Sequence, residues 1–123
     1  MHLYLLVACN GLGEKQEKKL KKNLPDLKAA LQAYVDENAG DKVVLINECD
    51  SDDCEDWQLG ISLPVKKSAQ LKSPVKLFND LAGKYGIDCE VGAIEENERQ
   101  PVSYFGKQEG QGDAFLIAAY LGL

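Results

Sequence analysis

The sequence predicts a single α/β (α+β) domain, covering residues 1–123, in which about five strands form a mixed sheet with three helices. Short, nearly continuous apolar runs at 3–9 and 43–46 are typical of strands buried on both faces. Alternating apolar and polar residues at 57–65 and 87–93 have the period of a half-buried strand. Elsewhere apolar residues recur at helical spacing. The predicted order is β-α-β-β-α-β-β-α.

The first strand is predicted at 3–9, and the turn-forming run Asn-Gly-Leu-Gly ends it. The charged segment 14–23 has good helix formers but a single apolar residue, Leu20, so a helix there is expected to be solvated over most of its surface. Pro25 predicts a kink or a fresh helix start. The helix after it is expected to bury one apolar face and to end near Gly40. That face consists of Leu27, Ala30, Leu31, Tyr34 and Val35.

The second strand is predicted at 43–46, and the order strand, helix, strand predicts that it runs parallel to the first. We therefore expect Cys9 and Cys49, which follow these strands, to share one edge of the sheet. Since the two most apolar strands come first and second, they are favoured as parallel neighbours. The alternative topology is the split βαβ arrangement called ferredoxin-like, which the first six predicted elements match.

The second half of the chain is predicted to add three strands and two helices. The strand at 57–65 is followed by a loop at 66–72 and by a helix with Ser73 as N-cap and Pro74 at its first position, which Gly86 ends. The strand at 87–93 is expected to pair with a short fifth strand at 102–105. Asp113 is expected to cap a helix at 114–121, which is apolar almost all round and must be buried against the sheet or against another chain.

Composition limits the possible partners and locations. The longest apolar run is about ten residues, whereas a membrane span needs roughly 20. The sequence starts without a basic leader, so we expect a cytoplasmic protein with no membrane partner. The formal charge of −6 repels phosphate backbones and argues against nucleic acid. A basic protein partner is favoured instead.

The carboxylates are concentrated in residues 48–57, which we name the acidic segment. It contains Glu48, Asp50, Asp52, Asp53, Glu55, Asp56 and Trp57. An aromatic residue framed by charge is typical of a recognition surface, and this charge would speed encounter with a basic partner. We therefore predict a non-enzymatic binding protein, by analogy of charge and size with bacterial immunity and inhibitor proteins. The alternatives are a solvated loop and a Trp57 that is simply the first core residue of its strand.

A cation site on the acidic segment is a second hypothesis, because hard cations prefer oxygen ligands. Asp50, Asp52 and Asp56, with Glu48 nearby, could supply these oxygens. If Cys9, Cys49 and Cys54 converge at the sheet edge, a zinc site or redox pair is the alternative, so the weak metal candidates are Cys9, Cys49, Cys54 and Asp50. Counted from Asp50, the sixth and twelfth positions of a calcium loop are Glu55 and Ile61 instead of Gly and Glu, so that motif fails. Magnesium-dependent phosphoryl-transfer or hydrolytic chemistry could use the same edge, with Lys15 as a cationic group. No cofactor is predicted.

Other catalytic and cofactor motifs are incomplete. Gly11 and Gly13 resemble a dinucleotide turn, but the third glycine is replaced by Gln16. Four residues separate Cys49 from Cys54, a wider spacing than in most zinc knuckles, and the four cysteines are expected to be reduced thiols. The single histidine, His2, lies at the chain start, far from the acidic segment. These features favour a binding protein over an enzyme.

Self-association is the third hypothesis. The last helix carries apolar residues on more than one face, and the edge strand near Tyr104 is a further candidate for the contact. The helix residues concerned are Phe115, Leu116, Ile117, Tyr120 and Leu121. Apolar surface of this kind could form a homodimer that needs no ligand.

Overall fold

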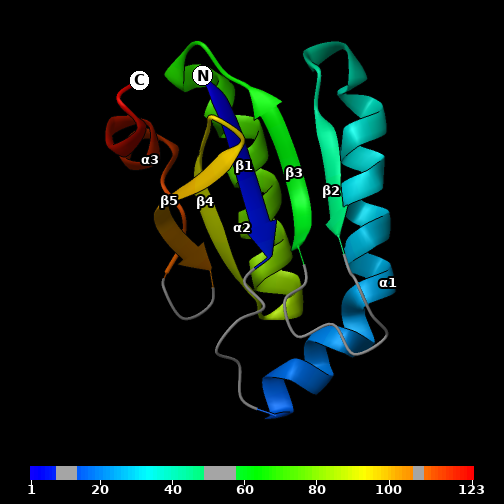
Figure 1. The fold of residues 1–123 in the computed structure, drawn as a ribbon. Helices are drawn as coiled ribbons and strands as arrows, with labels where there is room; N and C mark the ends of the chain where they lie inside the picture. Colours follow the sequence, from blue (N-terminus) through cyan, green and yellow to red (C-terminus); the bar gives the residue numbers. More distant parts are fainter. Residues whose placement is uncertain (8–13, 49–57, 107–109) are drawn as a thin grey trace.

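The computed structural model describes residues 1–7, 14–48, 58–106 and 110–123 (Figure 1). Its strands and α-helices are β1 (His2–Val7), α1 (Glu14–Glu37), β2 (Val44–Glu48), β3 (Gln58–Pro64), α2 (Lys72–Tyr85), β4 (Asp88–Glu95), β5 (Glu98–Gly106) and α3 (Ala114–Leu121). Short 3₁₀ turns at Ala39–Asp41 and Ser68–Leu71 precede β2 and α2. The predicted α+β class and the order of elements are confirmed.

The five strands form one sheet in the order β2-β3-β1-β4-β5, and every neighbouring pair is antiparallel. β1 and β2 run in the same direction, as predicted, but β3 lies between them. The predictions of a mixed sheet and of β1 and β2 as parallel neighbours are therefore wrong. The first six elements adopt the ferredoxin-like alternative. β3 buries Leu59 and Ile61 in the interior of the sheet, whereas β2, with Val44 56% exposed, takes an edge.

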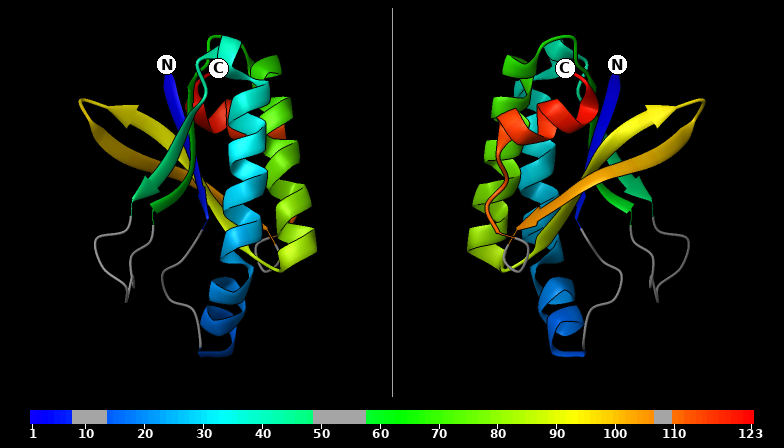
Figure 2. Two further views of the ribbon diagram at one scale, coloured as in Figure 1. Left: turned by 90° about the vertical axis from the view of Figure 1, so that its right-hand side faces the viewer. Right: turned by 90° about the vertical axis from the view of Figure 1, so that its left-hand side faces the viewer.

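All three helices cover the same face of the sheet (Figure 2). α1 packs on β2 and β3, α2 packs on β4 and β5, and α3 lies against β4, β5 and the turn before α2. The predicted inward residues of two strands are buried, although Gly60 and Ser62, predicted for the other face of β3, are buried as well. The inward residues are Leu59, Ile61, Leu63 and Val65 in and after β3, and Ile87, Cys89, Val91 and Ala93 in and before β4.

α1 is one continuous helix through Pro25, so the expected fresh start is wrong. Figure 1 shows its first turns inclined to the rest of the helix, which is the kink that proline favours. Leu20 is buried and continues the core-facing stripe of Leu27 and Leu31, while the lysines around it are exposed. The first turns of α1 extend beyond the sheet with a largely solvated surface, as predicted.

The start of α2 differs from the prediction. The helix begins at Lys72, and its N-cap is Leu71, which makes no side-chain cap. Ser73 instead shares a hydrogen bond of 2.8 Å with the Tyr34 hydroxyl on α1. The chain that leads into α2 is held in place before the helix begins: Gln70 Oε1 accepts hydrogen bonds from the backbone N–H groups of Lys66 and Lys67. At the other end Gly86 has φ 67° and caps the helix as predicted.

β5 is longer than predicted, because its first residues pair with β4 beyond the core. Glu96 and Asn97 have φ 52° and 65°, the left-handed values of a tight hairpin turn. Val91 pairs with Ser103 and Gly92 with Pro101, so Val102 is an extra residue that bulges. The bulge and Pro101 break the alternation by which a strand is recognised in sequence.

Candidate protein-binding surfaces

The structure describes Glu48, the first residue of the acidic segment, and Gln58, the residue that follows its last. Glu48 is the last residue of β2 and pairs with Gln58, the first residue of β3. The chain therefore leaves and re-enters the sheet on adjacent strands, of which β2 is an edge strand. The rest of the predicted site lies outside the described residues. This applies to Asp50, Asp52, Asp53, Glu55, Asp56 and Trp57, and to Cys9, Cys49 and Cys54.

The strand ends that precede Cys9 and Cys49 do share an edge of the sheet. β1 ends at Val7 and β2 at Glu48, and the two strands point the same way. β3 separates them, so they are not neighbours as predicted. The convergence of the thiols themselves stays a prediction.

A second surface is apolar and lies on α3; we name Phe115, Leu116 and Tyr120 the apolar surface. Their side chains are 68%, 56% and 63% exposed, respectively. Tyr104, which was predicted to join them in a homodimer, is 50% exposed but lies with Glu90 on the face of the sheet away from the helices. The opposite face of α3 buries Ile117, Ala118 and Leu121 in the core. The helix is apolar almost all round, and the predicted burial against the sheet is found on one face only. A hollow of about 150 Å³ between β5 and α3 is lined in part by Tyr104, Leu116 and Tyr120.

Local chemistry sets the position of α3. The Asp113 carboxylate accepts hydrogen bonds from the backbone N–H groups of Phe115 at 2.9 Å and Leu116 at 3.4 Å, which confirms the predicted cap. Just before it, the Asn79 side chain donates to the Gly112 carbonyl at 3.0 Å and accepts from its N–H at 2.8 Å. A side chain on Gly112 would collide with the ring of Phe105. The segment before α3 is therefore tied to α2 and seated on β5.

Replacing Asn79 with alanine should lower the free energy of unfolding by about 2 kcal/mol, because two half-buried backbone groups of Gly112 lose their partner. Urea denaturation followed by circular dichroism measures the change. Gln32→Ala is the control, since it also removes one side-chain hydrogen bond, to Asp36, but on the exposed face of α1. Equal stability of the two variants would contradict the role of Asn79 in fixing α3.

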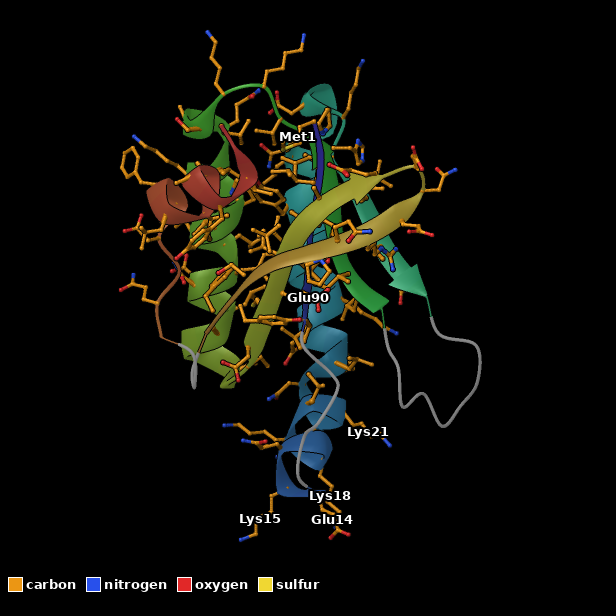
Figure 3. The ribbon with its side chains drawn as sticks, turned by 60° about the vertical axis from the view of Figure 1, so that its left-hand side comes forward. Met1, Glu14, Lys15, Lys18, Lys21 and Glu90 are labelled. Carbon is orange, nitrogen blue, oxygen red and sulfur yellow. The ribbon has the colours of Figure 1, made fainter. Side chains whose placement is uncertain are left out.

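The face of the sheet away from the helices carries a polar cluster that sequence reasoning missed. The Tyr4 hydroxyl donates to Glu90 Oε2 at 2.9 Å, and Tyr104, paired with Glu90 in the sheet, also hydrogen-bonds to it. Figure 3 shows Glu90 on this face. Burial and the Glu90 hydrogen bond raise the pKa of Tyr4, and desolvation and the Glu90 charge raise the pKa of Tyr104. Tyr4 is fully buried, so the cluster holds β4 and β5 onto β1.

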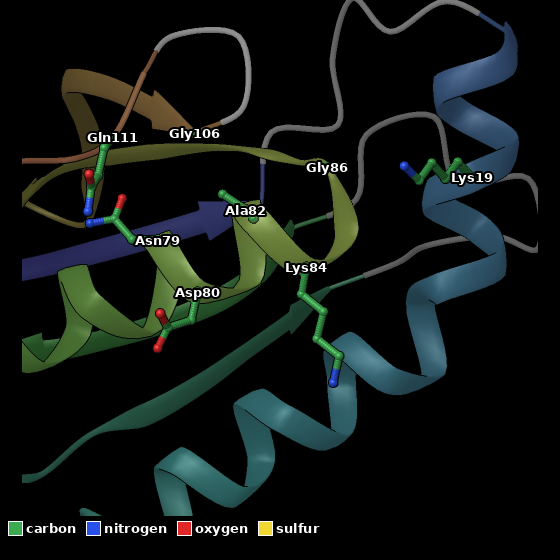
Figure 4. Close-up of a pocket in the computed structure, with 9 residues that line it drawn as sticks. Lys19, Asn79, Asp80, Ala82, Lys84, Gly86, Gly106 and Gln111 are labelled. Atoms are coloured by element: carbon green, nitrogen blue, oxygen red, sulfur yellow. The ribbon is translucent and has the colours of Figure 1, made fainter.

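The lysine-rich start of α1 projects from the opposite end of the molecule to Met1 (Figure 3). Lys15, the predicted cationic group, is exposed there. Lys19 lies on a cleft of about 390 Å³ between α1, α2 and the end of β5 (Figure 4). The cleft residues are Lys19, Asn79, Asp80, Ala82, Gly83, Lys84, Gly86, Gly106 and Gln111. Its lining carries charges of both signs, from Lys19, Lys84 and Asp80, and Asn79 is already bonded to Gly112.

Other expectations concern metals, thiols and membranes. Over residues 1–7, 14–48, 58–106 and 110–123, no three or more His, Cys, Asp or Glu side chains gather as a metal site would require. Cys89, a free thiol, lies in the core, where burial raises its pKa. It therefore packs as a small apolar residue. No helix in the same part of the chain is long and apolar enough to cross a bilayer.

Comparison of the chain with protein-family models, with curated protein sequences and with solved structures found no match. The functional argument therefore depends on the charges, contacts and exposure described above. Two features stand out from the rest of the molecule: the anchored ends of the acidic segment at one edge of the sheet and the apolar surface at the other.

Proposed function

We propose that the protein works by binding another protein, without catalysis, and that the acidic segment engages a basic partner. The observation that carries the proposal is the pairing of Glu48 with Gln58. This pairing fixes the two strand ends between which a segment with six carboxylates runs, and one of these strands, β2, is an edge strand. A dense negative charge at such a position steers a cationic partner during encounter. Neutralisation of a cationic enzyme is one form that this binding could take.

The charge of the segment differs from that of its surroundings in the sequence. Residues 48–56 contain six acidic and no basic residues, whereas residues 14–22 contain five lysines. The net charge of −6 therefore understates the local negative potential of the segment. Because exposed charges are screened beyond about 10 Å at 0.1 M salt, a partner close to the segment responds to this local charge.

Changing Asp52 and Asp53 together to asparagine should reduce the capture of basic proteins from a lysate several-fold at low salt. The change removes two charges and keeps the side-chain size, so it weakens steering without altering shape. Quantitative mass spectrometry of the proteins captured on the immobilised chain, at low and high ionic strength, measures the effect. The difference from the wild type should disappear at high salt.

The matched control is Glu96→Gln with Glu98→Gln, which removes the same charge from exposed residues at or beside the β4–β5 turn. That turn lies at the opposite edge of the sheet from Glu48, because β4 runs antiparallel to β1. Capture should be nearly unchanged in the control. If both double variants lose basic proteins equally, or if neither does, the acidic segment is not the recognition element.

A further inference from the structure

We propose that the basic partner adds an extended segment to β2, as a further strand that runs antiparallel to it. This rests on the proposed function, because it takes a basic partner of the acidic segment as its premise and states how that partner docks. β2 is the last strand at one side of the sheet, and no described strand lies beyond it (Figure 1). We name the side of β2 that faces away from β3 the free edge. Strand addition at such an edge is a recurring mode of peptide recognition.

A hydrogen bond at the end of the β1–β3 ladder shows which backbone groups of β3 face β2. The Val65 N–H donates to the Met1 carbonyl at 2.8 Å, just beyond the paired residues His2 and Pro64. These two residues are therefore a non-hydrogen-bonded pair. Since the two kinds of pair alternate along an antiparallel ladder, Ser62 and every second residue before it in β3 turn their N–H and C=O groups toward β2.

The same alternation determines the free edge of β2. Val44 and Ile46 pair with the residues of β3 that turn toward β2, so their backbone groups bond to β3. The N–H and C=O groups of Leu45 and Asn47 consequently point to the free edge. The register of β2 with β3 is continuous from Val44 to Glu48. The outward groups are thus spaced as a regular antiparallel partner strand requires.

The two edges of the sheet differ in their protection against a further strand. On β5, Pro101 lacks an N–H group and Val102 bulges, and both features oppose strand addition. β2 has the sequence Val-Leu-Ile-Asn-Glu, without proline or lysine, and it pairs without a bulge. Natural sheets usually block an edge that has no partner. The unblocked edge is therefore the one that we expect to receive a strand.

Side chains of β2 are also left partly uncovered. Leu45, Ile61 and Leu5 form one row across β2, β3 and β1 on the face that the helices cover. Ile61 and Leu5 are fully buried, whereas Leu45 is half-buried. On the opposite face, Val44 is 56% exposed. A strand beside β2 would cover both side chains, so we expect the bound segment to place apolar residues next to them.

Charge selects a basic segment as the occupant. Residues 44–56, which comprise β2 and most of the acidic segment, contain six acidic side chains and no basic one. An antiparallel segment enters the free edge at the Glu48 end of β2, from which the acidic segment continues. Basic residues at the start of the bound segment therefore lie closest to that point and are attracted. A second copy of the chain, which carries −6, is disfavoured by the same charge.

Binding of a synthetic peptide to the full chain tests the proposal. The probe has three lysines at its N-terminus, followed by alternating valine and threonine residues. Isothermal titration calorimetry at low salt should show saturable binding. In nuclear magnetic resonance spectra, the bound peptide should slow the exchange of the Leu45 and Asn47 amide protons at least tenfold. The Val44 and Ile46 amides, which already bond to β3, should change much less.

Asn47→Pro removes one outward N–H group and should weaken peptide binding at least tenfold. Asn47→Ala is the matched control, because it removes the same side chain and keeps the N–H group, and it should bind as the wild type does. Melting curves verify that both variants are folded. Peptides methylated on the backbone nitrogens of alternate residues give a second test that leaves the chain unchanged. Methylation of one alternate set should abolish binding, whereas methylation of the other set should not.

The double variant Asp52→Asn with Asp53→Asn separates strand addition from the proposed function. Both are supported if this variant and Asn47→Pro each weaken peptide binding. If only the double variant does, the acidic segment binds basic chains without strand addition, and strand addition is wrong. If only Asn47→Pro does, the proposed function fails, and with it the basic occupant. A peptide that does not bind the wild type, or that slows all four amides equally, would also overturn strand addition.

Discussion

Replacing Gly60 with alanine is expected to lower the free energy of unfolding by about 3 kcal/mol. Gly60 lies in β3, opposite Leu6 of β1 and Ile46 of β2. An added methyl group would overlap the backbone carbonyl oxygen of Leu5 and lie 2.8 Å from the Cα atom of Leu6. Backbone atoms in the middle of a sheet cannot move aside unless the strands separate. Because β2 is held in the sheet through β3, the disturbance extends to the edge that carries the acidic segment.

The control for Gly60 is Gly83→Ala, the same chemical change in α2. A methyl group on Gly83 meets no atom within 4 Å, and alanine favours a helix over glycine. This variant should gain about 0.8 kcal/mol. Urea unfolding measures both changes. The two midpoints should move in opposite directions, while the dependence of the unfolding free energy on urea concentration stays the same. An unchanged midpoint for Gly60→Ala would mean that β1 and β3 do not approach as closely as described.

The strand faces could be predicted from the sequence because burial follows the period of the strand. Leu59, Ile61 and Leu63 alternate with smaller or polar residues, and the sheet is covered by helices on one face only. The caps Asp113 and Gly86 were likewise predictable, since each acts within its own turn. Strand order was not predictable in this way. β1 pairs with β3 and β4, which are distant in sequence, and apolar composition alone placed it beside β2.

The polar contacts could not be predicted, because they join residues that only the fold brings together. Tyr4 and Glu90 are 86 positions apart, and Asn79 and Gly112 are 33 apart. Tyr4 lies in an apolar run, which predicts that it is a core residue but gives no indication that its hydroxyl has a hydrogen-bond partner. The sequence feature related to this contact is Gly92. It pairs with Tyr4 and, because it has no side chain, leaves space for the Tyr4 hydroxyl that bonds to Glu90.

The apolar surface and the acidic segment differ in how far the structure describes them. The last helix is apolar almost all round and was predicted to be buried against the sheet or against another chain. The sheet covers only one of its faces, which leaves Phe115, Leu116 and Tyr120 exposed. That surface is described in atomic terms. For the acidic segment the structure describes only the strands at its two ends, so recognition of a basic partner stays a prediction from charge.

Replacing Tyr4 with phenylalanine is expected to cost about 2 kcal/mol at neutral pH, and this cost should shrink as the pH rises above about 10. The loss at neutral pH arises because Tyr4 donates to the charged Glu90 in a buried position. Burial and this hydrogen bond raise the pKa of Tyr4 in the folded protein above its unfolded value of about 10. Tyr4 therefore contributes its full stability below that value. The contribution is lost at higher pH, because the unfolded chain releases the phenolic proton more readily.

Denaturant titrations of the wild type and of Tyr4→Phe between about pH 7 and about pH 11 measure this difference. Both proteins should also weaken in alkali through Cys89, because burial raises the pKa of this thiol in each of them equally. The gap between their stabilities therefore reports on Tyr4 and on its coupling to Tyr104, which shares Glu90. Tyr120→Phe, at a site that is 63% exposed, is the control and should follow the wild type at every pH. If the gap between wild type and Tyr4→Phe stays constant up to about pH 11, the phenol does not depend on Glu90 and burial as described.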